Sequence, residues 1–129
     1  MNLLIDTHIL LWAAFEPRRL PRDAHDRLMD PDTRLWFSAV SIWEVAIKRG
    51  LDRPDFRIDP GPLRAGLLAN EYSELALEGR HCLGLGTLPG LHADPFDRML
   101  IVQAAAQGMA LLTADSKIAQ YGGPALLVT

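Results

Sequence analysis

Short apolar runs alternate along the chain with longer stretches in which apolar residues recur at helical spacing. Each short run predicts a strand that is buried on both faces, because it lacks the alternation of a half-exposed strand. We expect strands at residues 2–6, 35–39, 74–77, 110–113 and 126–128. We expect helices at residues 8–15, 22–29, 42–49, 62–70 and 96–107. This alternation predicts an α/β protein with a parallel sheet covered by helices on both faces.

Residues with capping preferences predict where the helices begin and end. Thr7 is expected to cap the first helix, Ser41 the third helix, and Asp94 the last helix. Gly108 is suited to end that last helix, because glycine tolerates the left-handed conformation found there. Residues 78–88 remain open between helix and loop, because their glycines weaken a helix.

The length and composition are those of a globular protein. With 129 residues, 49% of them apolar, the chain is expected to form one domain over residues 1–129. Cys82 is the only cysteine, so an internal disulfide is excluded and a reducing compartment is expected. No signal peptide is apparent, and no segment approaches the roughly 20 apolar residues that cross a bilayer. We therefore expect a cytoplasmic protein without membrane contact.

The net charge of −3 does not favour a free-standing nucleic-acid binder, because phosphate contacts usually require a basic face. Four arginines nevertheless lie within ten residues, and this group can either bind a phosphate chain or form a solvated helix surface. These arginines are Arg18, Arg19, Arg22 and Arg27.

Two acidic residues follow predicted strands closely. Asp6 comes directly after the apolar residues 3–5, and Asp115 lies one residue beyond the strand 110–113. Open parallel sheets bind ligands at the carboxyl ends of their strands, near the point where the strand order reverses. We therefore expect the two carboxylates to meet at one edge of the sheet.

Two further acidic residues lie in predicted helices. Glu44 stands in a helix that is apolar on nearly every side, where an unpaired carboxylate is costly, although a surface pair with Lys48 is an alternative. Asp97 lies in the first helical turn, where an acid also suits the helix dipole. Each acid alone has an ordinary structural explanation, and only the four together indicate a site.

Clustered carboxylates repel one another, and a divalent cation neutralises them. All-oxygen ligands favour Mg²⁺ or Mn²⁺, which can activate water and stabilise a leaving oxygen at a phosphodiester. Motifs for zinc binding, nucleotide binding and serine hydrolysis are missing. A haloacid-dehalogenase-type phosphatase is a rival, but it needs Asp-x-Asp after the first strand, and His8 occupies the second position.

Four sequence blocks appear in a characteristic order: DTHILLW at 6–12, SIWEVAIK at 41–48, HADPFDRMLI at 92–101 and LTAD at 112–115. The chain resembles the PIN-domain toxins of type II toxin–antitoxin systems, the VapC family, over essentially its whole length. The resemblance implies a three-layer PIN fold, in which a mostly parallel sheet of four to five strands lies between helices. It also implies an endoribonuclease toxin that uses Mg²⁺ or Mn²⁺ to hydrolyse phosphodiester bonds in RNA, a cognate antitoxin protein as partner, and a homodimer.

The acidic positions of that family fall on Asp6, Glu44, Asp97 and Asp115. Asp94 is an alternative to Asp97. We favour Asp97, because an acid inside the first helical turn can point inward, whereas Asp94 precedes Pro95 in extended backbone. Asp6 and Asp97 are expected to hold the principal metal ion, and the other two acids to complete the charge. A catalytically silent PIN fold that only binds a partner is the alternative, which the presence of all four acids does not favour.

Several neighbouring residues have two interpretations each. Thr7, Ser41 and Thr113 are expected either to aim the carboxylates through hydrogen bonds or to act as helix caps and strand ends. Arg98 is expected to contact a phosphate or to balance Asp94 and Glu44. His92 is a candidate for orienting Asp94. The aromatic residues that hint at a partner surface are better explained as core; they are Trp12, Phe15, Trp36 and Trp43.

Overall fold

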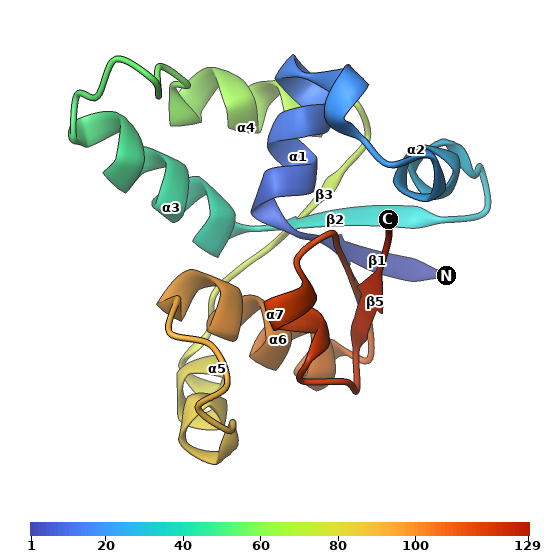
Figure 1. Cartoon of the computed structure of the whole chain (residues 1–129), viewed down its shortest axis with the longest axis vertical. Helices are drawn as coiled ribbons and strands as arrows, with labels where there is room; N and C mark the ends of the chain where they lie inside the picture. The colour runs from blue at the N-terminus through green and yellow to red at the C-terminus, as the bar shows by residue number, and fades with distance from the viewer.

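Five strands form one parallel sheet with helices on both faces in the computed structural model, which describes residues 1–129 (Figure 1). The strands are β1 (Asn2–Ile5), β2 (Arg34–Ser38), β3 (Ser73–Leu75), β4 (Ala110–Thr113) and β5 (Ala125–Leu127). Their order in the sheet is β3-β2-β1-β4-β5, and every neighbouring pair is parallel. The predicted three-layer α/β fold is confirmed.

Seven helices connect the strands, and two 3₁₀ turns follow α1 and α5. They are α1 (Thr7–Phe15), α2 (Arg22–Met29), α3 (Ala39–Gly50), α4 (Pro60–Ala69), α5 (Gly79–Gly84), α6 (Pro95–Gln107) and α7 (Ser116–Ala119). Helix α5 lies in the segment that the sequence left open, and the four-residue α7 was not predicted. None of these helices combines the length and apolarity that crossing a bilayer requires.

The first and third helices begin at other residues than predicted. Asp6, not Thr7, caps α1, because its carboxylate accepts a hydrogen bond from the amide two residues later. Ser38, not Ser41, caps α3 in the same way, so this helix begins directly at the end of β2. Both corrections have one cause: a short polar side chain at the end of a strand (Ser38) or directly after it (Asp6) supplies the first acceptor of the next helix.

The sheet separates two apolar clusters of the core. Leu3 and Ile5 of β1 face the cluster beneath α1–α4, whereas Leu4 between them faces the cluster beneath α6 and α7. Phe37 anchors the first cluster and Leu100 the second, and both side chains are fully buried. Since β1 is covered on both faces, its sequence is a continuous apolar run that ends where the strand leaves the core at Asp6.

The strand order reverses between β1 and β4. The chain moves outward from β1 to β2 and β3, then returns across the sheet to place β4 on the other side of β1. The amide of Asp6 donates to the carbonyl oxygen of Leu112 at 3.0 Å, so the end of β1 is tied to β4. This switch point brings the carboxyl ends of two strands together at the edge where α/β sheets bind their ligands.

Candidate active site

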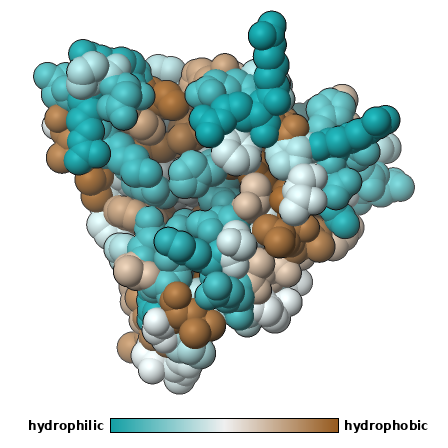
Figure 2. Space-filling model, in the orientation of Figure 1, coloured by the Kyte–Doolittle hydropathy of each residue, from teal (hydrophilic) through white to brown (hydrophobic).

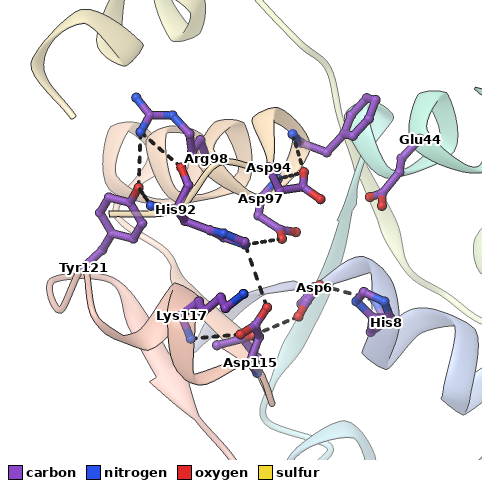
Figure 3. Close-up of polar contacts among 12 residues, drawn as sticks. Asp6, His8, Glu44, His92, Asp94, Asp97, Arg98, Asp115, Lys117 and Tyr121 are labelled. Atoms are coloured by element: carbon purple, nitrogen blue, oxygen red, sulfur yellow. Dashed lines mark hydrogen bonds and ion pairs between the residues drawn. The ribbon is translucent and has the colours of Figure 1, made fainter. Parts of the chain in front are cut away.

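The four predicted acidic side chains lie together at this edge of the sheet (Figure 3). Asp6 follows β1, Glu44 lies in α3, Asp97 lies in the first turn of α6, and Asp115 follows β4. They come from distant parts of the chain, and the carboxyl edge of the sheet brings them into one cluster, which we call the carboxylate cluster.

Asp6 is the most deeply buried member of the carboxylate cluster, with 1% of its surface exposed. Its Oδ2 accepts a hydrogen bond from the Thr113 hydroxyl at 2.8 Å, and its Oδ1 accepts one from the amide of His8 at 3.2 Å. Burial raises the pKa of Asp6, while these hydrogen bonds oppose the rise and the charge of Glu44 adds to it. Thr113 thus lies where it can aim this carboxylate.

Asp94 and Asp97 lie three positions apart in the sequence and have different surroundings. Asp94 caps α6, because its Oδ1 accepts hydrogen bonds from the amides of Phe96 and Asp97. Asp97 instead points into the carboxylate cluster and is 4% exposed. Burial, followed by the charges of Asp6 and Asp94, raises the pKa of Asp97 to about 6. The geometry favours Asp97 over Asp94 as the acid of the site.

Glu44 combines both interpretations that its sequence allowed. Its Oε2 accepts a hydrogen bond from Lys48 Nζ at 2.8 Å, yet its side chain is only 2% exposed. Its Oε1 is buried and has no hydrogen-bond partner. A buried carboxylate oxygen without a partner is costly, because it has lost its water without replacement. A cation bound among the carboxylates would satisfy this oxygen.

Asp115 lies at the rim of the carboxylate cluster, with 33% of its side chain exposed. It caps the short α7 through the amide of Lys117 at 2.8 Å, and its own amide donates to Thr113 Oγ1 at 3.0 Å. His92 Nε2 lies 2.8 Å from Asp97 Oδ2 and 3.9 Å from Asp115 Oδ2. One atom from each of these three residues lies within 4.8 Å of the other two, so the carboxylates of Asp97 and Asp115 are close enough to share a metal ion.

The donor set therefore fits a hard divalent cation. The carboxylates offer many oxygen ligands, their mutual repulsion is only partly relieved by hydrogen bonds, and the unpartnered oxygen of Glu44 is buried beside them. Such a cation would lower the cost of holding these charges together.

Three other predicted residues make contacts that differ from the expectation. The hydroxyls of Thr7 and Ser41 are buried and hydrogen bond to each other at 2.8 Å, joining α1 to α3. Arg98 forms no ion pair with Asp94 or Glu44, and its guanidinium instead donates to backbone carbonyl oxygens and to the Tyr121 hydroxyl.

Sequence reasoning missed two contacts of the site. His92 contacts Asp97, not Asp94, because the cap position turns Asp94 toward the backbone of α6. No sequence pattern indicates a role for Tyr121. It lies in the turn after α7, and its hydroxyl contacts His92, which is 29 positions away in the sequence. A single sequence contains no periodicity that pairs two loops.

The profile of the PIN domain family matches residues 3–124. No curated protein sequence gives a significant match.

Solved structures with similar folds come from VapBC and toxin–antitoxin complexes. A chain in the structure of VapBC2 from Rickettsia felis, bound to a DNA fragment from their promoter, has a TM-score of 0.73 at 13% identity, and all of both chains is covered. A chain of VapBC-1 from nontypeable Haemophilus influenzae has a TM-score of 0.65 at 21% identity, with 94% of this chain and 92% of that chain covered. A chain of a toxin–antitoxin complex from Klebsiella pneumoniae has a TM-score of 0.60 at 14% identity, with 96% and 95% covered.

At these identities the solved structures establish the fold, and the profile match establishes the family. The match spans nearly the whole chain, and it includes the sheet edge where the four acidic side chains converge. The predicted resemblance is confirmed at this level: the chain belongs to the PIN domain family.

Proposed function

We propose that this protein is a metal-dependent endoribonuclease and the toxin of a toxin–antitoxin pair. The carrying observation is the convergence of four carboxylates from separate elements on one sheet edge, with a buried oxygen of Glu44 left without a partner. A fold needs no such cluster for stability, because buried like charges cost free energy. Membership of the PIN domain family supports the nuclease assignment.

Mg²⁺ or Mn²⁺ is the proposed cofactor. Asp6 and Asp97 would hold it, and Glu44 and Asp115 would complete the charge. A bound divalent cation supplies Lewis-acid activation of water and of the phosphodiester. The chain itself fixes the ligand geometry: Thr113 donates to Asp6 at 2.8 Å, and the His92 ring contacts Asp97 at 2.8 Å.

RNA is the proposed substrate, and an antitoxin protein and a second copy of the chain are the proposed partners. The likeness to chains from VapBC complexes supports the antitoxin. Exposed aromatic side chains also support bound partners, because Phe15 is 53% and Trp43 is 54% exposed, contrary to the expectation that both belong to the core. Figure 2 shows hydrophobic side chains in several separate patches among hydrophilic ones on one face.

The test is cleavage of transfer RNA and of mixed-sequence RNA in Mg²⁺, with and without EDTA. We expect the parent protein to cleave at least one of them, EDTA to stop cleavage, and Asp6→Asn to stop it without unfolding the chain. Asp55→Asn is the matched control, because Asp55 is exposed in the loop between α3 and α4. Equal cleavage by the Asp6→Asn variant would show the site to be wrong. Metal binding without cleavage of either RNA would favour a catalytically silent module.

A further inference from the structure

A set of hydrogen bonds lies beside the carboxylate cluster, between the loop that precedes α6 and the turn that follows α7 (Figure 3). The Tyr121 hydroxyl accepts a hydrogen bond from the backbone amide of His92 at 2.9 Å. It also accepts one from the guanidinium of Arg98 at 3.2 Å. One hydroxyl from the end of the chain therefore holds both a loop residue and a helix residue in place.

The same guanidinium fastens the loop at further points. Arg98 donates to the carbonyl oxygens of Leu88 at 3.4 Å, Pro89 at 3.0 Å and His92 at 3.5 Å. The planar, permanently charged fork of arginine suits several acceptors in fixed directions, whereas a lysine offers one point charge. Arg98 is thus engaged with the backbone of its own protein.

The loop position held in this way is His92. Its ring Nε2 lies 2.8 Å from Asp97 Oδ2, and its side chain is only 12% exposed. A carboxylate oxygen accepts hydrogen bonds, so the ring nitrogen is the donor when Asp97 is ionised. The hydrogen bond selects one orientation of the Asp97 carboxylate, and the ring can make it only if the loop stays where Arg98 and Tyr121 hold it.

We propose that Arg98 and Tyr121 are positioning residues that act through His92 to aim the carboxylate of Asp97 into the metal site. The inference rests on the proposed nuclease function for its effect on catalysis, but its effect on metal binding is measurable without any substrate. Under this proposal Arg98 holds the loop around His92 in place and does not contact an RNA phosphate directly.

The test compares Tyr121→Phe with Tyr72→Phe, two variants that each lose one hydroxyl. Tyr72 is half-buried in the apolar groove between α1 and α4, on the other face of the sheet. The dissociation constant for Mn²⁺ is measured by electron paramagnetic resonance titration, and kcat and KM are measured for the cleaved RNA. We expect Tyr121→Phe to weaken Mn²⁺ binding and to lower kcat, each by about 10-fold, with KM within about twofold of the parent. Tyr72→Phe should match the parent.

Three further variants test the other two residues of this hydrogen-bond set, Arg98 and His92. Arg98→Lys should weaken Mn²⁺ binding as Tyr121→Phe does, because one ammonium cannot replace the fork. His92→Ala should have the largest effect, and His92→Gln should recover part of it, because a glutamine amide can donate near the position of the ring nitrogen.

The inference is overturned if Tyr121→Phe and Arg98→Lys bind Mn²⁺ as tightly as the parent. It is also overturned if Arg98→Lys raises KM while kcat and Mn²⁺ affinity stay unchanged, since that result would place Arg98 on the RNA. If the parent binds Mn²⁺ but cleaves no RNA, the proposed function fails, and the Mn²⁺ titrations still decide the positioning role. Thermal unfolding of each variant separates a local effect from loss of the fold.

Discussion

The two halves of the carboxylate cluster are held by different kinds of structure. Asp6 and Glu44 are attached to β1 and α3, and they are 1% and 2% exposed. Asp97 and Asp115 lie at helix starts that are reached through loops, and the His92 ring lies between them. We call Asp6 and Glu44 the core-held half, because the core positions them. We call Asp97 and Asp115 the loop-held half, because hydrogen bonds between loops position them.

The two halves therefore contribute differently to the site: one carries most of the free-energy cost of buried charge, and the other depends on the position of loops. Burial makes the Asp6–Glu44 half costly when no cation is bound, because Glu44 Oε1 then has no hydrogen-bond partner. The Asp97–Asp115 half also depends on the loop before α6 and the turn after α7, so a change in these connections can shift a carboxylate. Substitutions in the two halves should therefore fail in different ways.

The largest expected effect is on the rate of RNA cleavage, which should fall much more when an acid of the core-held half is replaced than when Asp115 is replaced. Asp6→Asn should lower the single-turnover rate of RNA cleavage by about 1,000-fold, an amount on the order of 4 kcal/mol in the barrier, because a buried oxygen ligand is lost. Asp115→Asn should lower it by only about 10-fold, because Asp115 lies at the rim with 33% of its side chain exposed. Rates at saturating Mg²⁺ check both values. Equal losses in the two variants would contradict the division into halves.

The next effect concerns the one hydroxyl that joins the halves. Thr113 Oγ1 donates to Asp6 and accepts from the amide of Asp115, and the side chain is fully buried. Thr113→Val keeps the shape but leaves both partners unsatisfied, so we expect a loss of about 1–3 kcal/mol in the free energy of unfolding. Thr87→Val is the matched control, because the exposed Thr87 hydroxyl contacts only the Gly84 carbonyl oxygen. Urea unfolding in EDTA measures both; similar losses would show that Thr113 has no special place.

The strands and helices that carry the four acidic residues were predictable from sequence because local patterns determine them. The apolar run before Asp6 marks a strand buried on both faces, and the Asp94-Pro95 pair with Gly108 marks both ends of α6. Strand alternation with helices was enough to place Asp6 and Asp115 at one edge, and the structure has them there.

The hydrogen bonds around Asp97 were less predictable for a physical reason. His92 was paired with Asp94, because nothing local shows that the cap turns Asp94 away, and Tyr121 carries no pattern. Exposure was also misjudged: Trp43 of α3 packs edge-on against Phe96 and is still 54% exposed, and apolarity alone does not separate such a position from the core. Contacts between loops depend on the assembled fold, so neither periodicity nor capping preference predicts them.

A smaller effect appears in the pH dependence of the metal-free protein. The pKa of Asp97 is about 6 in the folded chain and its ordinary value is 3.8, so between these pH values the folded state binds a proton that the unfolded state has released. Stability therefore falls as pH rises through this window and stays low above it. The raised pKa of Asp6 acts in the same direction.

Asp97→Asn should remove this penalty. Two pKa units represent roughly 3 kcal/mol, and solvent screening reduces the expected gain at pH 7 to on the order of 1–2 kcal/mol. The gain should shrink toward pH 4 and vanish well below pH 3.8, where the parent is protonated in both states. Urea unfolding in EDTA from pH 4 to pH 8 measures it, with Asp55→Asn as control. A variant that gains as much at pH 4 as at pH 7 would rule out titration as the cause.

The smallest expected effect tests whether a cation replaces the lysine beside the core-held half. Lys48 is 40% exposed, so its pair with Glu44 is worth on the order of 1 kcal/mol or less. Lys48→Met should destabilise the protein by that amount in EDTA, and the exposed Lys117→Met, the matched change at the other lysine, should have less effect. In saturating Mn²⁺ the loss from Lys48→Met should shrink, because the bound cation then neutralises Glu44 from the side of Oε1. If the loss were as large in Mn²⁺ as in EDTA, Glu44 would not face the ion, and the core-held half would contain Asp6 alone.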